Sequence, residues 1–200
     1  MRPAAFVLAS VIFGCGAIRA QQPASRTGHE GHSAPPAAAM ARLMTPAPVI
    51  GDIPLIDRAN RATSLRAAVD TDDPVFLNFI FTTCTTVCPV MSAGFAQLHD
   101  QLGADRGRVR LVSISIDPEV DTVVTLRAYA ERYHAGESWR FFTGSPDSIT
   151  AAQRVFSAYR GDKTNHAPAT YFRRGRAAPW QVVSGLSSAE TLLTLVRGPS

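Results

Sequence analysis

Two cysteines four residues apart, Cys84 and Cys88, directly follow the apolar run Val75–Phe81. Far downstream, a histidine stands two residues before a proline, as His166 and Pro168. Thiolates are soft ligands that suit copper, and a neutral imidazole can complete a three-coordinate site. Structural zinc sites use four protein ligands, and only three strong ones are visible here. Two neighbouring thiols can also exchange disulfides. The residues alone therefore leave open a metal site, a redox switch, or both.

The sequence around the cysteines predicts a strand followed by a helix. The apolar run is typical of a central parallel strand covered on both faces, and helical spacing of apolar residues covers Val90–Leu102. If Cys84 lies in the loop and Cys88 opens the helix, the two sulfurs converge at the helix N-terminus. Backbone N–H groups stabilise a thiolate there. A disulfide enclosing so few residues would constrain the unfolded chain little, so a purely structural role is the weaker interpretation.

The rest of the pattern alternates strands and helices and predicts an α/β sandwich with a mixed central sheet flanked by helices. Asp121 or Thr122 is the expected N-cap of the second helix. The expected strands are 50–57 (edge strand or hairpin), 109–116, 139–142 and the hairpin 169–172 with 180–183, and the expected further helices are 121–134, 145–159 and 187–196.

The first 20 residues have the pattern of a secretory signal peptide, with Arg2 before the apolar run Ala4–Phe13. This run is shorter than the roughly 20 residues of a membrane span. Cleavage after Ala20 would release a soluble protein. Alternatively, the residues up to Cys15 resemble a bacterial lipobox, in which that cysteine carries lipid and anchors the protein to the membrane surface. Both routes predict export to the bacterial periplasm and leave Cys84 and Cys88 as the one dithiol.

Residues 21–48 are rich in Ala, Pro, Ser and Gly without apolar periodicity, which predicts a flexible tether before a folded domain at 49–198. Within the tether, His29, His32, Met40 and Met44 are interpreted as linker residues, with an auxiliary copper-binding role as the alternative.

The charge pattern does not favour nucleic acid as a partner. The chain has 20 Lys and Arg residues against 16 Asp and Glu, and loss of Arg2 and Arg19 with the signal peptide would leave 18 basic against 16 acidic residues. The arginines are scattered, which is typical of a solvated surface.

Four segments resemble one known family. Phe81–Pro89 resembles the signature of the Sco/SenC family, thioredoxin-like copper proteins that help to assemble the binuclear copper centre of cytochrome c oxidase. Ser115–Thr122 and Phe142–Ser145 resemble two further family segments, and Asn165–Phe172 resembles the segment that carries the metal-binding histidine. The resemblance covers roughly Val49 to Val196 and implies a thioredoxin-like fold.

The resemblance also implies that Cys84, Cys88 and His166 bind copper, as Cu(I), Cu(II) or both. The implied partners are the copper-bearing subunit of cytochrome c oxidase and other periplasmic thiol or copper proteins. Two departures stand out: Thr85–Thr86 replaces a common Pro and Asp, and Asn165 replaces a common aspartate before the histidine. The second change removes an acidic partner from His166.

Three functions remain open at this stage. The first is a metallochaperone that passes copper to the oxidase. The second, and the one enzymatic interpretation, is a thiol–disulfide oxidoreductase in which Cys84 or Cys88 attacks a partner disulfide; Pro168 resembles the proline that faces the dithiol in such enzymes. The third is a redox sensor or copper buffer assisted by His29 and His32. The copper site requires His166, whereas the redox functions do not.

Other residues that could do chemistry have plainer interpretations. His99 is expected at the surface or half-buried, and His134 is expected as a partial cation near a helix C-terminus. Met91 is expected in the core. Asp117 and Asp121 are interpreted as a strand-end turn residue and a helix cap rather than as an acid–base pair.

Overall fold

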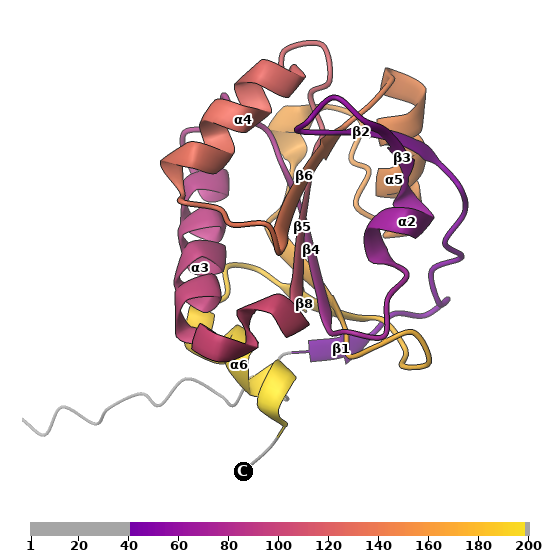
Figure 1. Cartoon of the computed structure of the whole chain (residues 1–200). Coiled ribbons are helices and arrows are strands. Elements are labelled where there is room, and N and C mark those ends of the chain that lie inside the picture. Colours follow the sequence, from indigo (N-terminus) through magenta and orange to yellow (C-terminus); the bar gives the residue numbers. More distant parts are fainter. Residues whose placement is uncertain (1–40, 199–200) are drawn as a thin grey trace, which may run out of the picture. The chain divides into compact units, whose positions relative to one another are not determined.

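The computed structural model describes residues 41–198, which form one sheet of order β1-β8-β7-β4-β5-β6-β2-β3 with helices on both faces (Figure 1). The strands are β1 (Ala41–Leu43), β2 (Pro54–Asp57), β3 (Ala62–Ser64), β4 (Val75–Ile80), β5 (Arg110–Ser115), β6 (Trp139–Thr143), β7 (Ala169–Arg173) and β8 (Gln181–Ser184). The helices are α2 (Leu65–Val69), α3 (Val87–Gln101), α4 (Val123–Arg132), α5 (Pro146–Val155) and α6 (Ala189–Arg197), with 3-10 turns η1 (Gly103–Arg108) and η2 (Lys163–Asn165).

Strand β4 lies in the middle of the sheet, and every one of its residues is buried. It pairs in parallel with β5 and antiparallel with β7, while β5 pairs in parallel with β6. Its side chains alternate between two cores: Phe76 and Ile80 pack under α3, α4 and α6, and Leu77 and Phe79 pack on the side of α2 and α5 (Figure 1). The predicted α/β sandwich with a mixed sheet is therefore confirmed.

The starts of α4 and α5 agree with the capping residues in the sequence, whereas α3 begins without a side-chain cap. Helix α3 begins at Val87, before the apolar stripe that starts at Val90, so that Cys88 lies inside its first turn. The N-cap of α4 is Thr122, whose hydroxyl accepts from the Thr125 N–H. Helix α5 has Ser145 as its N-cap and proline in its first turn.

The sheet begins earlier than the sequence predicted. Residues of β1 were placed in the tether, yet Ala41 pairs with Val183 at one edge of the sheet, and the Met44 N–H donates to the carbonyl of Trp180. Hydrogen bonds to a neighbouring strand hold this segment in the sheet. A strand of three residues is too short to show a periodic pattern in the sequence. The predicted signal peptide, Cys15, His29 and His32 lie outside the described residues. Among the helices described between residues 41 and 198, none has the length and apolarity to cross a membrane.

Candidate metal centre

The two cysteines lie together where the loop after β4 meets helix α3. The Cys84 N–H donates to the Phe81 carbonyl at 3.1 Å, which closes the loop into a tight turn. The Cys88 N–H, in the first turn of α3, donates to the Cys84 sulfur at 3.4 Å. Both cysteines are free thiols. The predicted placement, with Cys84 in the loop and Cys88 opening the helix, is confirmed.

The two thiols differ in pKa because their surroundings differ. Burial raises the pKa of Cys84, but hydrogen bonds from the backbone at Cys88 and Thr86 outweigh it, so that the pKa lies below its usual 9.0. Burial raises the pKa of Cys88 to about 12, and the charges of Cys84 and Asp121 add to this rise. Cys84 is half-buried and Cys88 has no exposed surface. Cys84 is therefore the thiol that loses its proton first and meets solvent.

A buried carboxylate fixes the start of the dithiol loop. Asp121 has no exposed surface, and it accepts hydrogen bonds from the Thr82 N–H at 3.1 Å, the Thr82 hydroxyl at 2.5 Å and the Ser115 hydroxyl at 2.6 Å. These bonds join the ends of β4 and β5. The interpretation of Asp121 as a helix cap was wrong, because Thr122 caps α4 and the Asp121 side chain turns into the interior. In the sequence, the one indication of this interior role was that Asp121 lies in Ser115–Thr122, the second segment that resembles the family.

His166 lies at the end of η2 and points its ring toward β4. Its Nε2 lies 2.9 Å from the Phe79 carbonyl oxygen. Because a carbonyl can only accept, Nε2 carries the proton and Nδ1 keeps its lone pair. Burial lowers the pKa of His166, the Phe79 hydrogen bond partly opposes this, and the charge of Arg160 adds to the lowering. A neutral imidazole with one N–H held by a backbone carbonyl is the usual state of a metal-binding histidine.

The structure does not bring His166 together with the thiols as a finished metal site. Within residues 41–198, no three His, Cys, Asp or Glu side chains are grouped so that they could hold a metal ion. Phe81 connects the two parts, because its carbonyl accepts from Cys84 and its ring packs edge-on against the His166 ring, with centroids 6.5 Å apart. The dithiol half of the predicted ligand set is assembled, and the role of His166 as the third ligand stays a prediction.

The segment Asp162–His166, here called the η2 loop, is tied to the end of β5 by an ion pair. Lys163 Nζ lies 2.5 Å from Asp117 Oδ2 and 5.8 Å from the centre of the Phe81 ring. The Lys163 side chain is 40% exposed and that of Asp117 is 10% exposed. Asp117 is indeed a strand-end turn residue, since its carbonyl accepts from the N–H of Asp121. A hollow of about 200 Å³ opens beside the loop and is lined by His166, Lys163 and Asp117 among others.

The remaining candidates have structural roles. His99 is 4% exposed and thus lies deeper than the predicted surface or half-buried position, and its Nε2 pairs with the Ser138 hydroxyl at 3.1 Å. Burial lowers its pKa and the charge of Arg106 lowers it further. Met91 is a core residue, as predicted, and His134 is exposed just after α4.

A comparison with protein families shows which family the chain resembles over most of its length. The family model for SCO1/SenC matches residues 46–176. The chain belongs to the SCO1/SenC family. A SCO1 protein homolog of Bacillus subtilis is 40% identical over 72 residues, which are 36% of this chain and 37% of the relative. The mitochondrial SCO2 homolog of Bos taurus is 32% identical over 112 residues, 54% of this chain and 40% of the relative. The chain thus spans less than half the length of these two curated relatives.

Solved structures of the family share the fold. BsSco, a member of the Sco family of cytochrome c oxidase assembly proteins, is 26% identical and superposes with a TM-score of 0.63, covering 76% of this chain and 92% of that structure. ScoI of Arabidopsis thaliana, solved with copper bound, gives a TM-score of 0.63 at 22% identity, covering 74% and 96%. The predicted thioredoxin-like sandwich is therefore confirmed.

Proposed function

We propose that this SCO1/SenC protein binds one copper ion as cargo through Cys84, Cys88 and His166 and delivers it to the copper-bearing subunit of cytochrome c oxidase. The observation that carries the proposal is the pairing of two free thiols at the first turn of α3, with the Cys88 N–H on the Cys84 sulfur at 3.4 Å. Two thiolates and one imidazole are the ligands that select Cu(I). The copper-bound ScoI of Arabidopsis and the oxidase assembly role of the Sco family support the choice of metal and partner.

The protonation states of the three residues suggest the order in which they bind copper. Cys84 meets the ion first, because it is the more exposed thiol and its pKa is lowered. Cys88 then gives up its proton to the solvent as the second sulfur binds, since a coordinated thiol is deprotonated. His166 completes the site through Nδ1, whose lone pair is free, or through Nε2 after it leaves the Phe79 carbonyl. Either route requires the η2 loop to approach the dithiol.

A copper titration of the reduced full chain tests this proposal. We expect about one copper per chain with thiolate-to-copper absorption. His166→Ala should weaken copper binding by about tenfold to a hundredfold, because mutating even a residue that only hydrogen-bonds to a metal ligand has an effect of that size. His134→Asn is the matched control, because His134 is exposed just after α4 and has a positive φ of 51°, which asparagine tolerates better than alanine. Unchanged affinity in His166→Ala would remove this histidine from the site.

A second candidate function is thiol–disulfide exchange, and the difference between the two thiols favours it. The Cys84 thiolate attacks one sulfur of a partner disulfide, that bond breaks, and the partner's other sulfur leaves as a thiolate. Cys88 then loses its proton and attacks the Cys84 sulfur, which leaves the partner with two thiols and this chain with a disulfide. The disulfide switch identified in BsSco supports this alternative. Slow exchange but intact copper binding in His166→Ala would favour it over the metallochaperone.

We further propose export to the periplasm by the segment 1–20, and anchoring to the membrane surface through Cys15 when that cysteine carries lipid. A SCO1/SenC family lipoprotein of Bacillus anthracis supports the anchored form, with the fold shared at 22% identity and a TM-score of 0.63. Mass spectrometry of the processed protein distinguishes cleavage after Ala20 from lipid on Cys15. Retention of Met1 on the secreted or membrane-bound protein would contradict both.

A further inference from the structure

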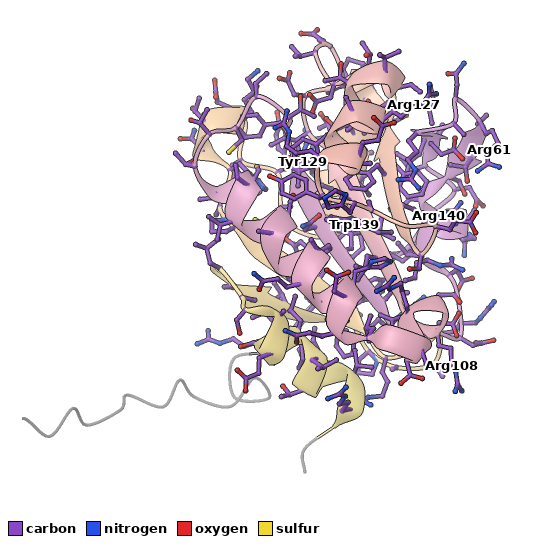
Figure 2. The ribbon with its side chains drawn as sticks, turned by 60° about the vertical axis from the view of Figure 1, so that its left-hand side comes forward. Arg61, Arg108, Arg127, Tyr129, Trp139 and Arg140 are labelled. Carbon is purple, nitrogen blue, oxygen red and sulfur yellow. The ribbon has the colours of Figure 1, made fainter. Side chains whose placement is uncertain are left out.

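A second charged hollow lies at the opposite end of the sheet from the dithiol. The dithiol loop follows the carboxyl end of β4, whereas this hollow opens beside Arg110 and Arg140, at the amino ends of β5 and β6. Since β4, β5 and β6 are parallel, the two places are separated by the length of the strands. The hollow has a volume of about 700 Å³. Its lining includes four arginines, Arg58, Arg61, Arg110 and Arg140. Figure 2 shows Arg61 and Arg140 on the same side of the domain.

Three of these guanidinium groups are held by neutral partners. Arg58 donates to the carbonyls of Ala135 and Gly136 at 3.3 and 3.1 Å. Arg110 donates to the carbonyl of Ala68 at 3.2 Å. Arg140 lies over the ring of Phe142, 5.4 Å from its centre. Backbone carbonyls and an aromatic face fix the positions of the three groups without cancelling their charge, so each keeps N–H donors for a ligand.

Two of the arginines repel each other. Arg140 pairs in register with Val112, two residues beyond Arg110 on the neighbouring strand, so both side chains lie on the same face of the sheet. Burial lowers the pKa of Arg110, and the charge of Arg140 lowers it further, by more than the nearby Asp73 restores. Like charges on neighbouring strands of one sheet face are destabilising unless an anion lies between them.

The acidic residues around the hollow do not supply that anion. Asp57 is taken up by Arg61 at 2.8 Å and by the backbone N–H groups of its own turn. Asp73 and Glu137 also line the hollow, but within residues 41–198 neither forms an ion pair with Arg58, Arg110 or Arg140. Three fixed guanidinium charges therefore face two carboxylates that do not pair with them.

We propose that this hollow is a binding site for a phosphate group, held by the guanidinium groups of Arg110 and Arg140 with Arg58 beside them. Guanidinium forks match the geometry of a tetrahedral oxyanion and bind it through paired N–H donors. The volume exceeds that of bare phosphate, which suits a phosphate carried on a larger group as well. Free phosphate and the headgroup of an anionic phospholipid share this chemistry, and they are separated by experiment.

The test is calorimetric titration of the full chain with inorganic phosphate in a buffer without competing anions. We expect a dissociation constant of about 1 mM or lower, weakened about fivefold or more in Arg140→Gln and in Arg110→Gln. Arg154→Gln is the charge-matched control, because Arg154 is exposed on α5 and does not line the hollow. Arg140→Lys keeps the positive charge but loses the paired N–H donors of the guanidinium group. Its dissociation constant for phosphate should lie between those of Arg140→Gln and Arg154→Gln. Melting temperatures show whether each variant folds.

A second arm identifies the source of the phosphate. Binding to vesicles that contain phosphatidylglycerol, lost in Arg140→Gln, kept in Arg154→Gln and competed by inorganic phosphate, assigns the site to a lipid headgroup. Phosphate binding without such vesicle binding assigns it to a free phosphate. The proposal is overturned if neither probe binds, or if Arg140→Gln and Arg154→Gln bind both probes equally. Replacing Cys84 and Cys88 by serine should leave phosphate binding unchanged. The phosphate site and the copper site are therefore tested independently of each other.

Discussion

The dithiol loop and the η2 loop lie on either side of Phe81, and they are held in very different ways. The dithiol loop begins at Thr82, which Asp121 holds from inside the protein through two hydrogen bonds, and it ends in the first turn of α3. The η2 loop is held by an ion pair between Lys163 and Asp117 and by one hydrogen bond from its histidine to β4, both at the surface or half-buried. The proposed copper site thus has a fixed half and an adjustable half.

This difference has a functional consequence. Two sulfurs in fixed positions can coordinate an ion together at little entropic cost. A third ligand on a weakly held loop can bind the ion and dissociate from it. Under the proposed function copper must be bound and also released, and a site in which every ligand was fixed would release copper slowly.

The largest expected effect concerns the fixed half. Asp121→Ala removes the acceptor of the Thr82 and Ser115 hydrogen bonds and leaves the buried Ser115 hydroxyl and the half-buried Thr82 N–H without it, which should lower the free energy of unfolding by about 3 kcal/mol. Chemical denaturation measures this. Asp117→Asn, which removes the charge of the half-buried ion pair with Lys163 instead, should change the stability far less. Equal losses in the two variants would mean that the two loops are held equally firmly.

The second effect concerns the pH dependence of stability. The pKa of Cys88 rises from 9.0 in the unfolded chain to about 12 in the folded protein, so between these values the unfolded state loses a proton that the folded state keeps. Stability is therefore fully present below pH 9 and falls as pH rises, by about 1.4 kcal/mol at pH 10.

Cys88→Ala should remove this part of the slope, whereas Cys84→Ala should leave most of it, because burial is a larger cause of the raised pKa of Cys88 than the charge of Cys84. Denaturation of both variants and the parent chain under reductant, from pH 8 to pH 11, measures the difference. Parallel curves for the parent and Cys88→Ala would show that Cys88 is not held protonated.

The smallest effect concerns the adjustable half. Lys163→Met breaks the ion pair with Asp117 and frees the η2 loop to approach the dithiol, which should raise the copper affinity of the reduced protein by roughly threefold, the scale of an exposed ion pair. Lys163→Arg, which keeps the pair, is the control. Amide hydrogen exchange at His166, whose N–H donates to the Lys163 carbonyl, should speed up in Lys163→Met even without copper. Exchange that stays unchanged would show that the ion pair does not hold the loop.

The sequence predicted the features that depend on neighbours along the chain. The four-residue spacing of the cysteines and the helix after them placed both sulfurs correctly. The sequence could not predict the role of Asp121, because its partner Thr82 is 39 residues away and an aspartate before a helix has the pattern of a cap. The orientation of His166 depends on a backbone carbonyl 87 residues away, and the pairing of β1 depends on β8. Such contacts follow from the packed fold and leave no local pattern.

The most direct test of the proposed copper site is X-ray absorption spectroscopy of the copper-loaded full chain beside its His166→Ala variant. We predict two copper–sulfur distances of about 2.3 Å and one copper–nitrogen distance of about 2.0 Å, by analogy with zinc sites, and loss of the nitrogen ligand in the variant. A nitrogen ligand that persists in His166→Ala, or copper bound without sulfur, would contradict the proposed site and point instead to the histidines at positions 29 and 32.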